Sequence, residues 1–172
     1  MILAKDIKDK EYDSYFHTYV KLTKGDLIQS LKTDLDTLIA LIREIPEGKR
    51  TFAYEKGKWS ILQLIQHCVD TERVLQYRAF SIARGEKQML NSFNENEYVD
   101  ATPTESIQFK SLLNEFICLR NSTISMFENM PLDVTCKIGQ AGGSQLSVRA
   151  AGFIILGHWN HHMNILKTRY LV

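Results

Sequence analysis

The chain has few cysteines and no long hydrophobic run, and each shortage excludes a class of protein. Cys68, Cys118 and Cys136 are an odd number without CxxC spacing, so the sequence does not support a disulfide framework. No apolar run approaches the ~20 residues of a membrane span, and no signal-peptide core follows Met1. We therefore expect a cytoplasmic protein that does not enter a membrane.

The chain also lacks an excess of charge of either sign. Lys and Arg number 21 against 20 Asp and Glu, which gives a formal net charge of +1. Without a long basic run or an RNA-binding signature, binding to nucleic acid is not expected. The length of 172 residues predicts one domain, residues 1–172, in which about 1–24 form an N-terminal extension.

Strand signals are sparse, and four amphipathic segments predict an all-α fold. Apolar residues recur at helical spacing in about 26–45, 60–85, 102–130 and 147–170. Ser60 and Gln63 form a capping box, and Ser147 is a fair N-cap. Thr102, with Pro103 and Glu105 behind it, predicts the start of the third helix.

Four helices of roughly 20 residues predict a four-helix bundle, whose core commonly holds metal sites. The connection of residues 85–101 is long for a bundle loop. We expect it to cross the bundle or to form part of a pocket rim. The glycine-rich stretch 139–144 has no preceding strand signal and no P-loop lysine, so it predicts a loop with little support for phosphate binding.

Three histidines are the candidate site. His158 and His162 have H-x3-H spacing, which places both rings on one face of a helix. His67, on the second helix, is the candidate third ligand. Three protein ligands leave a coordination position open, as in catalytic zinc sites. The alternative is a set of partly buried core histidines with hydrogen-bond partners, because H-x3-H also occurs by chance.

Glu72 is the notable carboxylate, because its helical phase places it among apolar residues. It is a weak candidate for a general base, and an interhelical salt bridge is at least as good an interpretation. The partner would come from one of four arginines: Arg73, Arg78, Arg120 or Arg169. Cys68 is expected to be a small buried core residue.

Several motifs, in order, resemble the DinB-like superfamily, especially its bacillithiol-transferase-like branch. They are Lys58-Trp59-Ser60, His67-x2-Asp70-Thr71-Glu72-Arg73, Tyr77-Arg78, Ala83-Arg84-Gly85 and Gly157-His158-x2-His161-His162. The resemblance covers most of the chain. It implies an up-down-down-up four-helix bundle, often a homodimer, with a divalent metal, usually zinc or nickel, held by His67, His158 and His162.

The resemblance also implies a reaction class. Related proteins transfer low-molecular-weight thiols to electrophiles or isomerise thiol-linked substrates. We therefore expect a metal-dependent enzyme that transfers such a thiol to an electrophilic small molecule. A metal-dependent hydrolase and a non-catalytic dimeric bundle with a structural or vestigial metal are the alternatives. Trp159 is bulkier than the polar residue expected there, so we expect it to alter the shape of the pocket.

Overall fold

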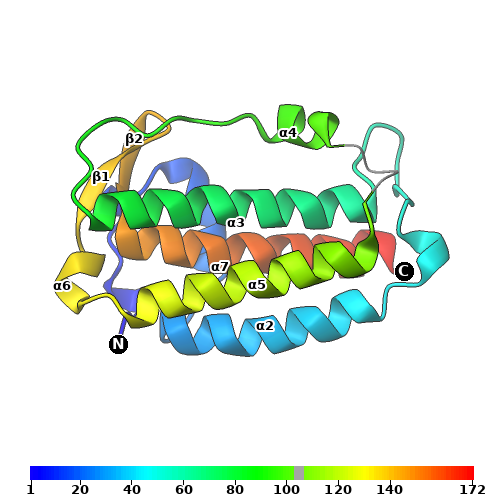
Figure 1. Cartoon of the computed structure of the whole chain (residues 1–172), viewed down its shortest axis with the longest axis horizontal. Helices are drawn as coiled ribbons and strands as arrows, with labels where there is room; N and C mark the ends of the chain where they lie inside the picture. Colours follow the sequence, from blue (N-terminus) through cyan, green and yellow to red (C-terminus); the bar gives the residue numbers. More distant parts are fainter. Residues whose placement is uncertain (103–106) are drawn as a thin grey trace.

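Four long helices packed lengthwise form the body of the molecule (Figure 1). The computed structural model describes residues 1–102 and 107–172. The long helices are α2 (Leu27–Arg43), α3 (Ile61–Ala83), α5 (Phe109–Glu128) and α7 (Val148–Ile165). Helices α2 and α7 run in one direction, and α3 and α5 run in the other. The predicted up-down-down-up bundle is therefore confirmed.

The predicted helix starts follow from side-chain caps. Asp26, Ser60 and Ser147 each accept a hydrogen bond from a backbone N–H in the first turn of α2, α3 and α7. The Gln63 N–H donates to the Ser60 hydroxyl at 3.3 Å, and the Gln63 side-chain oxygen accepts from the Ser60 N–H at 2.8 Å, so the predicted capping box is present. These bonds satisfy helix donors that have no partner within the helix.

The connection from α3 to α5, residues 84–108, returns along the bundle because these two helices run parallel (Figure 1). It contains the short helix α4 (Glu95–Ala101). It is held at Leu90, whose N–H donates to the Gln140 carbonyl at 2.9 Å and whose carbonyl accepts from the Gly142 N–H at 2.9 Å. As predicted, this long connection forms part of a pocket rim.

The start of the third long helix differs from the prediction. Helix α5 begins at Phe109, whereas Thr102 ends α4. The Thr102 hydroxyl donates to the Tyr98 carbonyl at 2.8 Å, so it closes the helix before it instead of opening the one after it. The remaining predicted cap residues, Pro103 and Glu105, lie outside the described residues.

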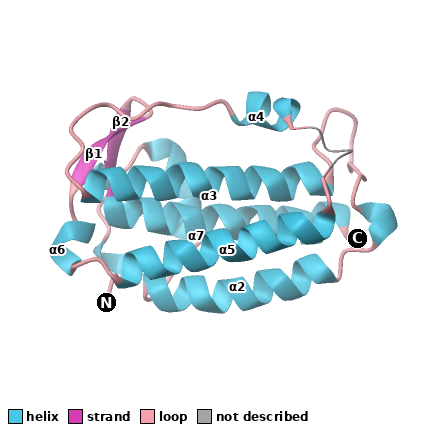
Figure 2. Ribbon diagram, in the orientation of Figure 1, coloured by secondary structure: helices cyan, strands magenta, loops and turns pink. Residues whose placement is uncertain are grey.

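The structure contains a small β-hairpin that the sequence did not predict (Figure 2). After α6 (Leu132–Thr135), β1 (Ile138–Ala141) pairs antiparallel with β2 (Ser144–Ser147). Gly142 and Gly143 form the two-residue turn with φ angles of 62° and 88°, which glycine adopts without strain. The glycine-rich stretch is therefore a hairpin turn that leads directly into α7.

The N-terminal extension, residues 1–24, packs on the bundle. It forms three short 3-10 turns and then α1 (His17–Lys21), which lies against α7. Glu11 anchors it: burial alone would raise the pKa of this carboxyl, but hydrogen bonds from Arg149 and Ser147 hold it below its usual value.

The apolar stripes predicted from helical spacing form the core. Cys68 is fully buried within it, as expected. The stripe of α2 is also buried along its length: Leu27, Leu31, Leu35, Leu38 and Ile42. Across residues 1–102 and 107–172, none of the helices combines the length and apolar character needed to span a membrane.

Candidate metal centre

The fold brings the three predicted histidines together in the middle of the molecule. His67 lies in the second turn of α3, and His158 and His162 lie one turn apart on the facing side of α7. The His158 Nε2 atom is 3.0 Å from His67 Nε2 and 3.1 Å from His162 Nε2. All three side chains are buried, so residues 91 positions apart form one cluster of nitrogen donors.

The spacing of these nitrogens fits a shared metal ion. Zn–N bonds of about 2.0–2.1 Å at tetrahedral angles separate two ligand nitrogens by about 3.3 Å. A neutral ring nitrogen carries either one proton or one lone pair, so His158 Nε2 cannot make full hydrogen bonds to both neighbours. The His162 Nδ1 atom is buried without a partner among the described residues. The cluster is therefore poorly explained by hydrogen bonding alone.

The surroundings keep the three imidazoles neutral. Burial lowers the pKa of His67 to about 4, although Glu95 opposes this shift. Burial, with smaller contributions from His67 and His161, lowers the pKa of His162 to about 3. The pKa of His158 falls well below its ordinary value because the ring is buried and faces the other histidines. Neutral rings at pH 7 have the lone pairs that metal binding needs.

Two aromatic side chains cover the cluster. The ring centroids of Trp59 and His67 lie 4.6 Å apart, and the Tyr19 ring meets the His158 ring edge-on with centroids 5.3 Å apart. Tyr19 also contacts His161, which is half-buried beside the cluster. Helix α1 can approach this closely because α7 has Gly157 at the crossing, where an added Cβ would lie 2.0 Å from the Tyr19 carbonyl oxygen.

The histidines open into a cavity of about 500 Å³, here called the histidine cavity. Its walls come from α1, α3, α7, the connection before α4 and the hairpin turn. The lining residues are Asp13, Tyr15, Phe16, Tyr19, Trp59, His67, Thr71, Leu75, Arg78, Ser92, Phe93, Glu95, Ala141, Gly142, Ser144, His158 and His162. A cavity of this size accommodates a small organic molecule.

Glu72 is part of a buried ionic network outside this lining. Arg120 donates to its carboxylate at 2.9–3.2 Å and to Asp34 at 2.9 Å. Thr123 and Trp159 donate to the same carboxylate at 2.8 and 2.7 Å. Of the four candidate arginines, Arg120 is thus the partner. The network joins all four long helices, with α2 reached through Asp34, and the interhelical salt bridge is the interpretation that the geometry supports.

Trp159 does not shape the histidine cavity, contrary to the expectation from the resemblance. Its side chain is fully buried, packs on Phe116 with ring centroids 4.3 Å apart and donates to Glu72. Adjacent residues on a helix point about 100° apart. The ring therefore enters the core while His158 faces the cavity.

Sequence reasoning predicted only the three histidines among the residues that line the cavity, and four of the others show why. Thr71 and Arg78 follow His67 by four and eleven residues, so their shared face of α3 could have been recognised from helical spacing. Tyr19 and Trp59 come from segments outside the long helices. No periodic pattern shows where such segments dock.

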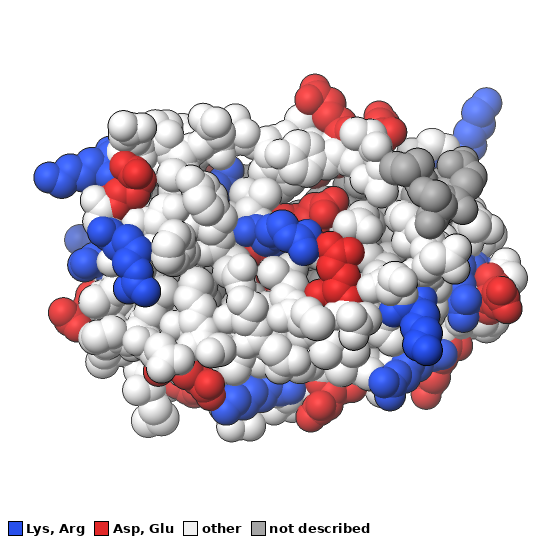
Figure 3. Space-filling model, in the orientation of Figure 1, with Lys and Arg blue, Asp and Glu red and all other residues white. Residues whose placement is uncertain are grey.

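A second cavity of about 460 Å³ lies on the other side of the connection, between α3 and α4. The face drawn in Figure 3 is hollowed there, and blue and red side chains lie next to each other at one edge of the hollow, whereas most of its rim is uncharged. Arg78, Ser92 and Phe93 line both cavities. No described residue of this second lining belongs to the histidine cluster.

The fold and the site define a class: a helical bundle with three buried histidines gathered at a cavity. The DinB superfamily model matches residues 30–166, and the chain belongs to this family. No curated protein matches the chain.

Two solved structures share the fold. One is YfiT from Bacillus subtilis, described as a probable metal-dependent hydrolase with an unusual four-helix bundle topology. It is 14% identical with a TM-score of 0.75, over 94% of this chain and 90% of that one. The other is a mycothiol-dependent maleylpyruvate isomerase, 11% identical with a TM-score of 0.64, over 80% of this chain and 58% of that one.

Proposed function

We propose that His67, His158 and His162 hold a divalent metal ion, zinc or nickel. The observation that carries this proposal is the convergence of three buried Nε2 atoms with neighbour distances of 3.0 and 3.1 Å. Imidazole suits both ions. Three ligands leave a coordination position for an exogenous group, and the adjoining cavity gives a small molecule access to it.

The function that this site supports best is transfer of a low-molecular-weight thiol to an electrophilic small molecule. A divalent metal would supply Lewis-acid chemistry by lowering the pKa of a bound thiol or water. The chain's own contribution is to present neutral donors and to exclude water. Burial lowers the pKa values of the histidines, and Trp59 and Tyr19 cover the cluster.

Metal-dependent hydrolysis is the second candidate, with water in place of the thiol. The description of the similar YfiT structure favours it. The two candidates differ in whether a thiol is consumed. A panel of haloaromatic, enone and ester electrophiles should therefore be incubated with the metal-loaded protein, with and without added thiols. Thiol-dependent consumption supports transfer, whereas equal turnover without thiol supports hydrolysis and contradicts transfer.

The metal assignment is tested by His158→Ala. We expect this change to abolish stoichiometric zinc or nickel binding while the helices stay folded, because it removes the central donor of the cluster. Metal content by mass spectrometry and helicity by circular dichroism are the measurements. His17→Ala, outside the cluster, is the matched control. Equal metal content in the wild type and His158→Ala would contradict the site.

Removal of the metal separates a catalytic from a structural role. If the site is catalytic and preformed on the bundle, treatment with a chelator should abolish turnover and leave the helical signal nearly unchanged. A structural metal is coupled to folding, so its removal should unfold much of the chain. Large loss of helicity on chelation would therefore favour the non-catalytic alternative.

A further inference from the structure

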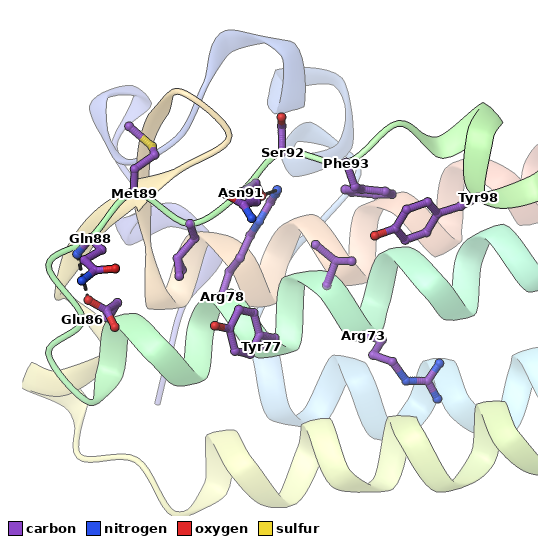
Figure 4. A pocket seen from close by; sticks show the side chains of 12 residues that line it. Arg73, Tyr77, Arg78, Glu86, Gln88, Met89, Asn91, Ser92, Phe93 and Tyr98 are labelled. Atoms are coloured by element: carbon purple, nitrogen blue, oxygen red, sulfur yellow. Dashed lines mark hydrogen bonds between the residues drawn. The ribbon is translucent and has the colours of Figure 1, made fainter.

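Arg78 is a buried cation without a carboxylate partner. It is 5% exposed, and its Nη2 donates to the Asn91 carbonyl at 2.6 Å. Figure 4 shows its side chain reaching from α3 to the segment that carries Asn91. Among the described residues, no carboxylate lies within salt-bridge distance of it, whereas the buried Arg120 has two. A buried guanidinium usually has an anion beside it.

The unpartnered polar atoms of the molecule gather at the same cavity. Over the described residues, four buried side-chain nitrogen or oxygen atoms have no hydrogen-bond partner. Three of them belong to the lining of the histidine cavity: Thr71 Oγ1, Arg78 Nε and His162 Nδ1. Thr71 and Arg78 share one face of α3 with His67. Two of these unpartnered groups therefore lie on the α3 wall of the same cavity.

Among the charged side chains that line the cavity, Arg78 is the one that can bind an anion. It is the one lysine or arginine among the described residues of the lining. The Asp13 carboxylate already accepts from the Tyr15 N–H at 2.8 Å and from the Ser144 hydroxyl. Glu95 interacts with His67 at the opposite end. Asp13 therefore lies at the hairpin end with its carboxylate hydrogen-bonded, and Glu95 lies at the histidine end, so Arg78 is the group of the lining that can attract an anion.

We propose that Arg78 binds a carboxylate or phosphate group of the ligand at the end of the histidine cavity beside the hairpin turn. The substrate is then an elongated anion, and the position of its reacting group at the histidines rests on the proposed metal-dependent function. His67 and Arg78 are eleven residues apart, so their Cα atoms lie about 16 Å apart along α3 at 1.5 Å per residue. The guanidinium lies beside the hairpin turn, because a Cβ added at Gly142 would be 3.6 Å from its Nη2 atom.

The test uses the full chain stripped of metal, so that it does not depend on the metal site. Hexanoate, hexyl phosphate and hexanol are titrated calorimetrically into the wild type and into Arg78→Gln, Arg78→Lys and Arg84→Gln. Arg78→Gln retains a donor for the Asn91 carbonyl and removes the charge. Arg78→Lys restores the charge, and Arg84→Gln removes an exposed charge near the end of α3.

We expect at least one of the two anions to bind about tenfold or more tightly than hexanol in the wild type and in Arg84→Gln, as charge-assisted hydrogen bonds predict. The better anion identifies the group. The preference should disappear in Arg78→Gln and return in part in Arg78→Lys. Equal affinity of all three probes for the wild type, or an unchanged preference in Arg78→Gln, would overturn the proposal.

The orientation of the ligand within the histidine cavity is tested by varying the length of the probe's alkyl group. Trp59 lies on His67 at the far end of the cavity, so its fluorescence reports ligand there. Straight-chain analogues of the better anion should change this signal only when they are long, and Trp59→Phe should remove the change. No response to the longest probe would overturn the elongated placement. Anion binding without metal binding would refute the proposed function and leave the anion site standing.

Discussion

Arg120 shows how one residue can hold together helices that the sequence does not pair. Its side chain is fully buried between Asp34 and Glu72, and Trp159 and Thr123 complete the carboxylate's hydrogen bonds. Burial by itself would lower the pKa of Arg120, but the two carboxylates raise it. The helical phase of Glu72 predicted a buried ion pair. It could not select the partner, because helical spacing says which face a residue occupies and not which helix faces it.

Arg120→Met should strongly destabilise the protein, by about 3–5 kcal/mol, because it leaves buried carboxylates without their cation. The free energy of unfolding from urea titration measures this effect. Arg73→Met is the matched control. Arg73 pairs with Glu115 at the exposed surface, where such pairs contribute about 0–1 kcal/mol. Similar losses in the two variants would contradict the role given to Arg120.

The buried histidines should make the metal-free protein sensitive to acid. In the unfolded chain a histidine takes up a proton near its ordinary pKa of 6.5, whereas burial lowers the pKa of His67 to about 4 and that of His162 to about 3. Between pH 6.5 and these lowered pKa values, the unfolded state binds more protons than the folded state. The free energy of unfolding therefore falls as the pH decreases from about 6.5 toward 4.

Chemical unfolding of the chelated protein at several pH values measures this dependence. His67→Gln/His162→Gln should have a flatter profile than the wild type over the same range. If both proteins lost stability in parallel between pH 6.5 and 4, the histidines would not be its cause.

At the scale of the element, close packing depends on two glycines of α7. A Cβ at Gly157 would lie 2.0 Å from the Tyr19 carbonyl oxygen, which is backbone and cannot move without α1. A Cβ at Gly152 would meet the side-chain ends of Leu27 and Phe127 at 2.5 and 2.8 Å, and these are core side chains and not the backbone of the extension. The same substitution should therefore have different effects at the two sites.

Gly157→Ala should release the N-terminal extension, although alanine favours a helix over glycine by about 1 kcal/mol. We expect faster proteolysis within residues 1–24 than in the wild type, with the helices of the bundle retained. Gly152→Ala, the matched control, should leave the extension protected. Cleavage at equal rates in wild type and Gly157→Ala would show that the close approach is not required.

The elements that the sequence predicted are those with local signals. The caps at Asp26, Ser60 and Ser147 and the apolar stripes depend on residues within a few turns of each other. The hairpin at Gly142 and the position of Leu90 on it depend on packing between distant segments. The histidine cluster was predictable because a family pattern supplied the long-range pairing that helical spacing lacks.

For the whole molecule, the homodimer expected from the resemblance stays a prediction. Tyr77 and Phe80 lie close together on α3 with 59% and 46% of their surface exposed. Sedimentation velocity should find a two-chain species, and Phe80→Lys should weaken it because burial of a charge is unfavourable. Leu132→Lys, at another exposed apolar residue on α6, is the control. A monomer at all concentrations would exclude the dimer.

The parallel arrangement of α3 and α5 has a consequence for how this fold can diversify. Antiparallel neighbours can be joined by 2–8 residues, but parallel ones need a chain that returns along the whole bundle. Here that return is the connection of residues 84–108, which supplies Ser92, Phe93 and Glu95 to the histidine cavity. Substitutions and insertions there can alter which molecules fit without disturbing the buried core. The topology thus separates the connection, which can change to bind new ligands, from the long helices, which must keep the histidines in place.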